Sequence, residues 1–401
     1  MRLNEKLSLL KTELKNRKAK IMIIGLGSVG SYLLDYLMST KDEGIEIIVV
    51  GRTHDKMEMD VNIVKVASLI RGQNRTKISI ESGIDLNDVS CIAGAIKKYD
   101  PDIIVNSSRA YSGLKYGSIS WSNFRAYGIW TPLSIKYAKN IMEAYTESNS
   151  KAVVINTSYS DAVIPWLKSA GKDYPDFGSG NVNHLVPRIK FALAKEHNIS
   201  DWWNIDLTYA VSHFHDVVIS KEGQTEGIKQ LIYAEYNGKD LEVSDSVFAA
   251  CKIAMPVDAK RNMMNASSNF EIIQAILDAV RDGKKTKLHT PGFDGNIGGY
   301  PVIIDGTKDS PEVYIDESKF SLDEMRKKNR ESIYLDGIEN VEDSKLFYTD
   351  ELIQKVKDKF DATLPKSVSF DRIDKTADFI IKNIIEKALN FGGSNADNRK
   401  A

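Results

Sequence analysis

Three glycines near the start of the chain are spaced for holding a phosphate-bearing ligand. The segment "KIMIIGLGSVG" ends an apolar run in the turn Gly25-Leu26-Gly27-Ser28-Val29-Gly30. In such a turn the first glycine permits a tight reversal, the second lets the backbone approach a pyrophosphate, and the third allows close packing of the following helix. Free N–H groups at the helix start attract the anion. The sequence therefore predicts a dinucleotide site at residues 25–30.

The next apolar run, "IEIIVVG", ends in Gly51-Arg52-Thr53. Sites for NAD usually carry Asp or Glu about 20 residues after the glycine turn, where the carboxylate accepts hydrogen bonds from the ribose hydroxyls. An arginine at this position can instead pair with the 2′-phosphate of NADP, with Thr53 close by. We therefore expect NADP as the preferred cofactor. NAD is the alternative if Arg52 only occupies a solvated turn.

These motifs need a parallel sheet to position them. Short apolar runs alternate with helical patterns over roughly the first 155 residues, which is the rhythm of βαβ units. The sequence predicts an α/β fold in which residues 1–165 form a Rossmann-type, doubly wound parallel sheet with an N-terminal helix. After residue 165 the rhythm loosens, with helices expected around 184–198, 267–283 and 370–390 and a strand near 205–212. Residues 166–401 are expected to form an α+β substrate or catalytic domain.

Composition excludes several classes of protein. The 401 residues carry a formal net charge of −1, so no overall field attracts nucleic acid or an anionic membrane. No run of about 18 apolar residues suggests a membrane span. Cys91 and Cys251 are the only cysteines and form no CxxC motif or disulfide framework. We expect a cytoplasmic enzyme with a small-molecule substrate and no nucleic-acid or membrane partner.

Five segments resemble, in order, the lactate/malate dehydrogenase superfamily, which includes the NAD-dependent family-4 glycosidases. They are "GRTHDKMEMDVNIVKVAS", "DIIVNSSRAYSGLKYG", "KAVVINTSYSDAV", "PDFGSGNVNHLVPRIKFALAKEHNIS" and "LTYAVSHFHDVVIS". The resemblance covers about residues 20–220. It implies an NAD(P)-dependent oxidoreductase that interconverts a secondary alcohol and a ketone on a small polar metabolite, which we expect to carry a carboxylate.

The resemblance also implies roles for individual residues. It places Asn106, Ser107 and Ser108 at the cofactor, and Asn156 at the substrate and the nicotinamide ribose. It gives His213 the acid/base role, and histidine can exchange the hydroxyl proton near neutral pH. His215 is the rival for this role, and a purely structural role for both histidines is the alternative.

The segment "NVNHLVPR" departs from the family pattern. Where the family has an aspartate that orients the histidine, this chain has His184, and no carboxylate lies nearby in the sequence. Arg188 is expected to bind a substrate carboxylate, and Asn183 is also expected to bind the substrate. Pro187 favours a helix that starts close to it, which would leave Asn183 and His184 in the preceding loop or cap. A structural role for these residues is the alternative.

Basic and aromatic side chains alternate after the fourth predicted strand. Arg109, Lys115 and Arg125 lie among Tyr111, Tyr116, Trp121, Phe124, Tyr127 and Trp130. Arg109 and Arg125 could clamp an anionic or ring-bearing substrate. The same residues could instead form a subunit interface. We expect a homodimer or homotetramer, because closed symmetric assemblies are common among soluble enzymes.

Two other functions stay open at this point. One is a redox-assisted glycosidase or lyase with a tightly held dinucleotide, as in the family-4 glycosidases. The other is a non-catalytic NADP-binding sensor. The family-4 enzymes hold a divalent ion with a cysteine and a histidine, but this chain has no cysteine between residues 92 and 250. We expect no metal.

Overall fold

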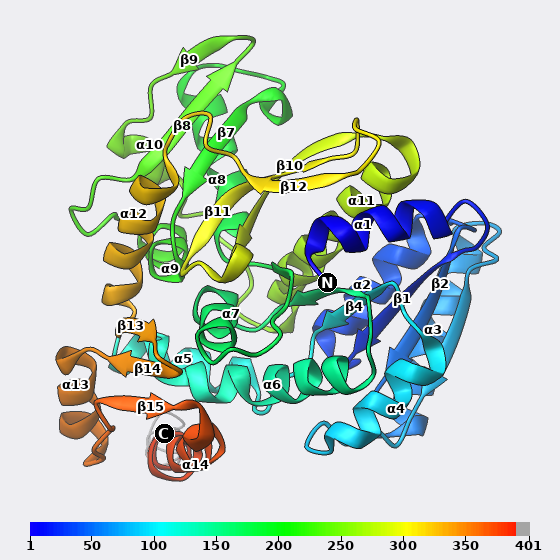
Figure 1. The fold of residues 1–401 in the computed structure, drawn as a ribbon. Helices are drawn as coiled ribbons and strands as arrows, with labels where there is room; N and C mark the ends of the chain where they lie inside the picture. Colours follow the sequence, from blue (N-terminus) through cyan, green and yellow to red (C-terminus); the bar gives the residue numbers. More distant parts are fainter. Residues whose placement is uncertain (390–401) are drawn as a thin grey trace, which may run out of the picture.

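The computed structural model describes residues 1–389, except for the side chain of Leu114. Its centre is a six-stranded parallel sheet with strand order β3-β2-β1-β4-β5-β6 (Figure 1). The strands are β1 (Ala19–Ile24), β2 (Ile45–Val50), β3 (Lys77–Glu81), β4 (Ile103–Asn106), β5 (Val153–Asn156) and β6 (Phe177–Gly178). This order is that of a doubly wound dinucleotide-binding fold, so the predicted fold class is confirmed.

Both faces of the sheet are covered by helices. Successive strand residues point to opposite faces, so Ile21 and Ile23 face one layer while Met22 and Ile24 face the other. Because helices cover both faces, the inner strands β1, β2, β4 and β5 are apolar at most positions, whereas the edge strand β3 alternates polar and apolar residues. The first layer contains α1 (Leu3–Glu13), α2 (Ser28–Ser39), α3 (His54–Ile70) and α11 (Asn262–Asp282), and the second contains α4 (Val89–Tyr99) and α6 (Thr131–Glu147).

Three small antiparallel sheets follow the parallel one, in agreement with the predicted α+β character. They are β7 (Asp206–Ala210), β8 (Leu231–Tyr236) and β9 (Lys239–Leu241); β10 (Lys285–Pro291), β11 (Gly299–Asp305) and β12 (Glu312–Ile315); and β13 (Ile338–Glu342), β14 (Lys345–Tyr348) and β15 (Ser367–Ser369). The boundary expected at residue 165 stays a prediction; β6, which follows it, completes the parallel sheet.

Further helices connect and cover these sheets. They are α5 (Gly113–Asn123), α7 (Ser160–Ser169), α8 (Val182–Glu196), α9 (His213–Glu222), α10 (Asp245–Ala250), α12 (Leu322–Leu335), α13 (Asp350–Phe360) and α14 (Ile373–Ile380). Helix α8 begins before Asn183, so Pro187 lies inside it and not in its first turn. The expectation that Asn183 and His184 precede this helix is therefore wrong.

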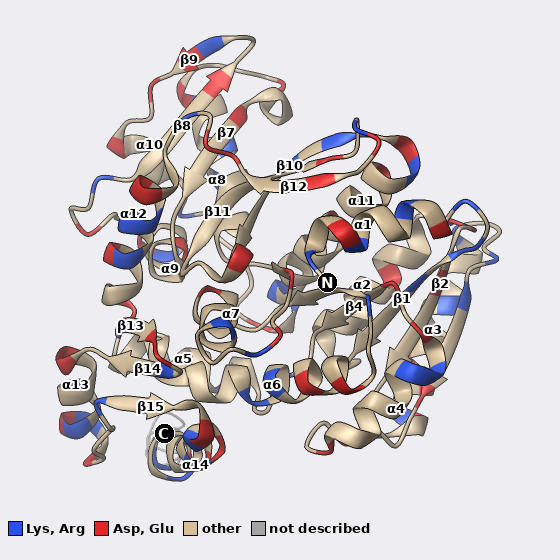
Figure 2. Cartoon of the chain, in the orientation of Figure 1, with Lys and Arg blue, Asp and Glu red and all other residues tan. Residues whose placement is uncertain are grey.

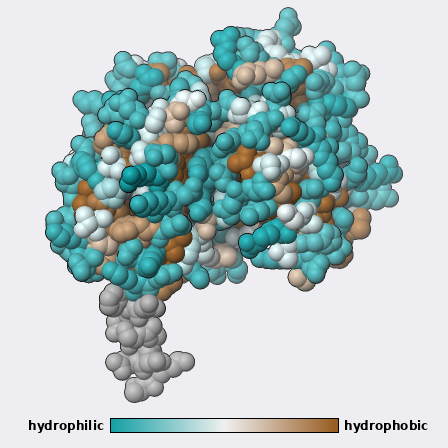
Figure 3. Space-filling model, turned by 60° about the horizontal axis from the view of Figure 1, so that its bottom comes forward, coloured by the Kyte–Doolittle hydropathy of each residue, from teal (hydrophilic) through white to brown (hydrophobic). Residues whose placement is uncertain are grey.

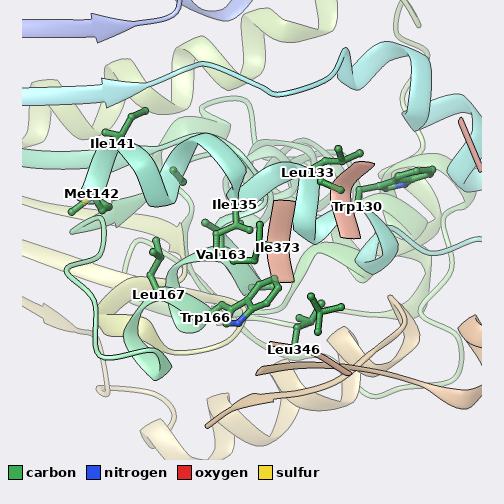
Figure 4. Close-up of a cluster of buried hydrophobic side chains, with 14 of the residues drawn as sticks. Trp130, Leu133, Ile135, Ile141, Met142, Val163, Trp166, Leu167, Leu346 and Ile373 are labelled. Atoms are coloured by element: carbon green, nitrogen blue, oxygen red, sulfur yellow. The ribbon is translucent and has the colours of Figure 1, made fainter. Parts of the chain in front are cut away.

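The third antiparallel sheet packs against the helices of the parallel sheet. Figure 4 shows Leu346 of β14 and Ile373 of α14 in one buried cluster with Val163 and Trp166 of α7. Burying such a side chain contributes roughly 1.5–3 kcal/mol relative to leaving it exposed. This packing fixes the connection between α12 and β13, which reaches the functional site.

The surface carries charges of both signs. Basic and acidic residues are mixed on exposed helices such as α3, α12 and α13 (Figure 2). On the face drawn in Figure 3, apolar residues form separate patches among hydrophilic ones. Within residues 1–389, no helix has the length and apolar character needed to cross a membrane.

Candidate active site

A cavity of about 1010 Å³ lies at the carboxyl ends of the parallel strands. A doubly wound sheet binds its ligands at this edge, where the strand order reverses. The loops after β1, β2, β4 and β5 line one side of the cavity, while α5, α8, α9 and the start of α11 supply the other. The cavity therefore joins the glycine turn to side chains from the second half of the chain.

The glycine turn is shaped for a pyrophosphate. Gly25 has a φ of 92°, which glycine adopts without strain. A Cβ atom on Gly30 would collide with the carbonyl oxygen of Gly25, so only glycine at this position lets α2 pack against the turn. A Cβ atom on Gly27 would meet nothing within 4 Å, and Gly27 is the N-cap of α2. The backbone at the helix start is thus open to an anion, and these residues fit a dinucleotide.

The rim near β2 carries charges of both signs. Arg52 and Thr53, the predicted cofactor-binding residues, line the cavity and are exposed, and so is Lys56. Asp85, from the loop after β3, also lines the cavity. Hydrogen bonds from Asn87 lower the pKa of Asp85, and the nearby charge of Arg52 lowers it further. The sequence analysis missed this carboxylate because it follows a different strand from Arg52.

His213 forms a pair with a buried carboxylate. Its Nδ1 lies 2.8 Å from Oδ2 of Asp336, which is fully buried at the end of α12. Tyr159 donates its hydroxyl to the same oxygen at 2.6 Å, and the N–H of Tyr127 donates to Oδ1 at 2.7 Å. The aspartate is thus held from three directions, and it leaves Nε2 of His213 available for a ligand in the cavity.

Two aromatic rings hold the imidazole in place. The ring of Tyr127 lies 4.7 Å from that of His213 and the ring of Tyr159 lies 5.1 Å away, both in edge-on contacts. Burial lowers the pKa of His213, but the Asp336 carboxylate outweighs burial, so the pKa lies above its ordinary value. Geometry and charge together favour an imidazole that accepts and returns a proton near neutral pH.

A second buried carboxylate holds the backbone of this segment. Oδ1 of Asp161 accepts a hydrogen bond from the N–H of His213 at 3.0 Å, and Oδ2 accepts one from the Asn181 amide. Burial raises the pKa of Asp161 to about 6, although His213 and these hydrogen bonds oppose the change. Asp161 therefore fixes the start of α9, where His213 lies.

His215 points away from the cavity. Its Nδ1 lies 2.7 Å from the Ser332 hydroxyl and its Nε2 lies 3.1 Å from the Thr225 carbonyl. The side chain is 1% exposed, and burial lowers its pKa to about 4. Both nitrogens are occupied by the protein, which supports His213 over His215 as the acid/base group.

Four polar side chains from α8 and α9, among them Ser220, line the cavity with buried atoms that have no hydrogen-bond partner in the described chain. In the described chain, Nε2 of His184, Nε of Arg188 and Oδ1 of Asp216 are buried without hydrogen-bond partners. Burial lowers the pKa of His184 to about 3 and raises that of Asp216 to about 7. The other nitrogens of Arg188 contact the Cys251 carbonyl at 3.2 Å and the Met255 sulfur at 2.8 Å.

Besides Gly30, which packs against Gly25, four predicted site residues do not line the cavity. Asn106 and Asn156 bond to each other at 2.9 Å beneath its floor. Asn183 faces α11, where its amide donates to Ser268 at 3.0 Å and to Glu271. Arg125 pairs with Glu222 and Glu226 on the protein surface. The predicted cofactor and substrate roles of these four residues gain no support from these contacts.

Other predicted residues do meet at the cavity, namely Leu26, Ser28, Val29, Ser107, Ser108 and Arg109. Ser107 donates its hydroxyl to the Gly25 carbonyl at 2.6 Å and so holds the glycine turn. Within residues 1–389, no group of three His, Cys, Asp or Glu side chains is placed to hold a metal ion.

No protein-family model matches the sequence, and no curated protein matches it. Among solved structures, malate dehydrogenase from Cryptosporidium parvum is similar, with a TM-score of 0.51, 16% identity and coverage of 80% of this chain and 98% of that one. Malate dehydrogenase from Plasmodium falciparum has a TM-score of 0.51 and 16% identity, with coverage of 79% of this chain and 95% of that one. Lactate dehydrogenase from Eimeria maxima, solved with NADH and oxamate, has a TM-score of 0.50 and 14% identity, with coverage of 79% of this chain and 92% of that one.

The fold and the glycine turn define a Rossmann-type protein. Within that class, the chain has the lactate/malate dehydrogenase-like fold that the sequence resemblance predicted. At these identities the likeness shows the fold alone.

Proposed function

We propose that the protein is an NAD(P)-dependent oxidoreductase that interconverts a secondary alcohol and a ketone on a small polar, carboxylated metabolite. The observation that carries this proposal is the His213–Asp336 pair, which opens onto the same cavity as the glycine turn. A proton-transfer group beside a dinucleotide site is what hydride chemistry on an alcohol requires.

In the proposed reaction His213, Asp336 and Arg188 have separate roles. A bound nicotinamide dinucleotide would supply the hydride acceptor or donor. Because Asp336 occupies Nδ1 of His213, Nε2 takes the hydroxyl proton when the alcohol is oxidised, and Asp336 stabilises the imidazolium that forms. Arg188 offers its unused Nε to the carboxylate of the substrate.

A substrate screen tests this function. We expect net formation of reduced cofactor, followed by absorbance at the nicotinamide band, with a member of a panel of 2-hydroxy acids and sugar acids, and the reverse with a 2-keto acid. A dinucleotide that is held tightly without net turnover would instead support the redox-assisted glycosidase or lyase. Binding without any reaction, together with loss of cellular function only when the glycine turn is altered, would support a sensor.

The charge at the cavity rim predicts the cofactor preference. If Arg52 reads the 2′-phosphate, then Arg52→Asp should weaken NADP binding by about 1.5–3 kcal/mol, which is the scale of a hydrogen bond to a charged group. NAD binding should become relatively favoured, because Asp85 already provides a carboxylate at the rim. Titration calorimetry measures both affinities. Arg75→Asp is the matched control, since Arg75 is exposed away from the cavity. Equal affinities for NAD and NADP in the unmodified protein would refute the NADP preference.

An exposed apolar stripe on α3 supports the proposed homo-oligomer. Met59, Ile63, Val66 and Ile70 are 65%, 65%, 55% and 81% exposed, and their spacing places them on one side of the helix. Contiguous exposed apolar surface of this kind marks interaction sites. We expect a dimer or tetramer by light scattering, and Ile63→Lys should dissociate it, because the buried charge would be unpaired. Tyr314→Lys, on β12, is the control. An unmodified protein that is monomeric at micromolar concentration would contradict the proposal.

A further inference from the structure

One face of α9 points into the cavity along its length. His213, Asp216, Val217, Ser220 and Lys221 all line the cavity. Residues at these spacings share one side of a helix. With a rise of 1.5 Å per residue, the polar row from His213 to Ser220 is about 10 Å long. This row is longer than a short 2-hydroxy acid.

The row offers unused hydrogen-bonding atoms beyond the acid/base histidine. Asp216 and Ser220 are 6% and 9% exposed. Among the residues that the structure describes, neither Oδ1 of Asp216 nor Oγ of Ser220 has a partner. A buried polar atom without a partner costs stability, so such atoms are retained where a ligand satisfies them. The other buried carboxylates nearby, Asp161 and Asp336, already accept hydrogen bonds from the protein.

Aromatic rings line the cavity together with this polar row. Trp121 of α5 and Tyr127 both line it, with their ring centres 6.3 Å apart. The ammonium group of Lys221 lies 4.9 Å from the Trp121 ring. A cavity with aromatic surface and a few placed polar groups suits a molecule that has both C–H surface and hydroxyls.

The charges around Asp216 favour a hydroxyl over an amine as its partner. Arg188, Arg261 and Lys221 line the same cavity, and an ammonium substituent would be repelled by these cations. A hydroxyl can donate to Asp216 and accept from a neighbouring cation or from Ser220. Arg188 remains available for a carboxylate.

We propose that the substrate is a polyhydroxylated acid whose reacting hydroxyl lies at His213 and whose further hydroxyls bond to Asp216 and Ser220. This inference rests on the proposed function and specifies its substrate. It makes Asp216 and Ser220 specificity-determining residues.

The test compares acids of equal chain length. Initial rates are measured with gluconate and mannonate, which differ in configuration at carbon 2, and with racemic 2-hydroxyhexanoate, which lacks the further hydroxyls. We expect kcat/KM for at least one of the sugar acids to exceed that for 2-hydroxyhexanoate at least about tenfold, the scale of one hydrogen bond to a charged group. Ser220→Ala and Asp216→Asn should each reduce this ratio about tenfold. Ser200→Ala, at an exposed position outside the cavity, should leave the ratio unchanged.

The outcomes separate this inference from the function on which it rests. Turnover of 2-hydroxyhexanoate that equals or exceeds that of both sugar acids would overturn the polyhydroxylated substrate and leave the oxidoreductase intact. Failure of every acid to react would contradict the oxidoreductase. In that event, calorimetry measures the affinities of the same acids for the dinucleotide-loaded protein. The inference fails if neither sugar acid binds more tightly than 2-hydroxyhexanoate. If Asp216→Asn does not fold, Ser220→Ala alone gives the same ratio test.

Discussion

Replacement of His213 by asparagine should lower turnover by about 10²–10⁴, the usual contribution of a positioned proton-transfer group. Dinucleotide affinity should stay near its original value, because the glycine turn and Arg52 lie on other elements. Asparagine can still bond to Asp336, but it cannot take a proton at neutral pH. Steady-state rates in both directions, together with cofactor titration, measure the two effects separately.

His215→Asn is the matched control for this experiment. The side chain of His215 bonds to Ser332 and Thr225 and does not face the cavity. We therefore expect a much smaller effect on turnover, provided that both variants fold equally well. Nearly full activity in the His213 variant, or a larger loss in the His215 variant, would reject His213 as the acid/base group.

The variant Asp336→Asn should lower turnover by a comparable factor of about 10²–10⁴. The carboxylate accepts hydrogen bonds from His213, Tyr159 and the Tyr127 backbone, whereas an amide can accept on only one side. If the oxygen of the introduced amide bonds to Tyr127, its NH₂ group turns towards His213 and favours the wrong imidazole tautomer. Tyr159→Phe removes one donor but keeps the histidine–carboxylate pair, so its loss should be much smaller. Equal losses in the two variants would contradict an orienting role for Asp336.

The pH profile gives an independent measure of the same pair. Oxidation of the alcohol needs neutral His213, and the pKa of His213 is raised, so the oxidation rate should rise at a pH above the ordinary histidine value of about 6.5. Asp336→Asn should move this rise to lower pH. The raised pKa also means that the pair stabilises the fold fully below about pH 6.5 and that this contribution is lost as pH rises through the raised pKa.

Local patterns predicted the parallel sheet and the glycine turn because each depends on neighbouring residues. The turn from Gly25 to Gly30 needs only a buried strand before it and a helix after it, and both are legible in the sequence. The choice of His213 over His215 came from the family resemblance of the segment that contains both. The structure adds the physical reason, which is that His215 is fully occupied by the protein.

The partner of His213 was beyond the sequence analysis. The family pattern places the orienting carboxylate in the segment around His184, whereas the structure supplies Asp336, which lies 123 positions after His213. In the sequence, "LDGIEN" reads as an ordinary helix end before a turn. The packing of α12 on α9, and of the last antiparallel sheet on α6 and α7, brings it to His213. The contacts of Asn183 and Arg125 could not be predicted from the sequence either, because their partners also come from distant segments.

Asp336 makes the arrangement of His213 depend on a segment 123 positions further along the chain. The glycine turn is held by the first half of the chain, including Ser107, whereas the carboxylate that bonds to the imidazole comes from the connection between α12 and β13. A defect in the packing of α12 or β13 would therefore displace the carboxylate from His213 and leave the glycine turn intact.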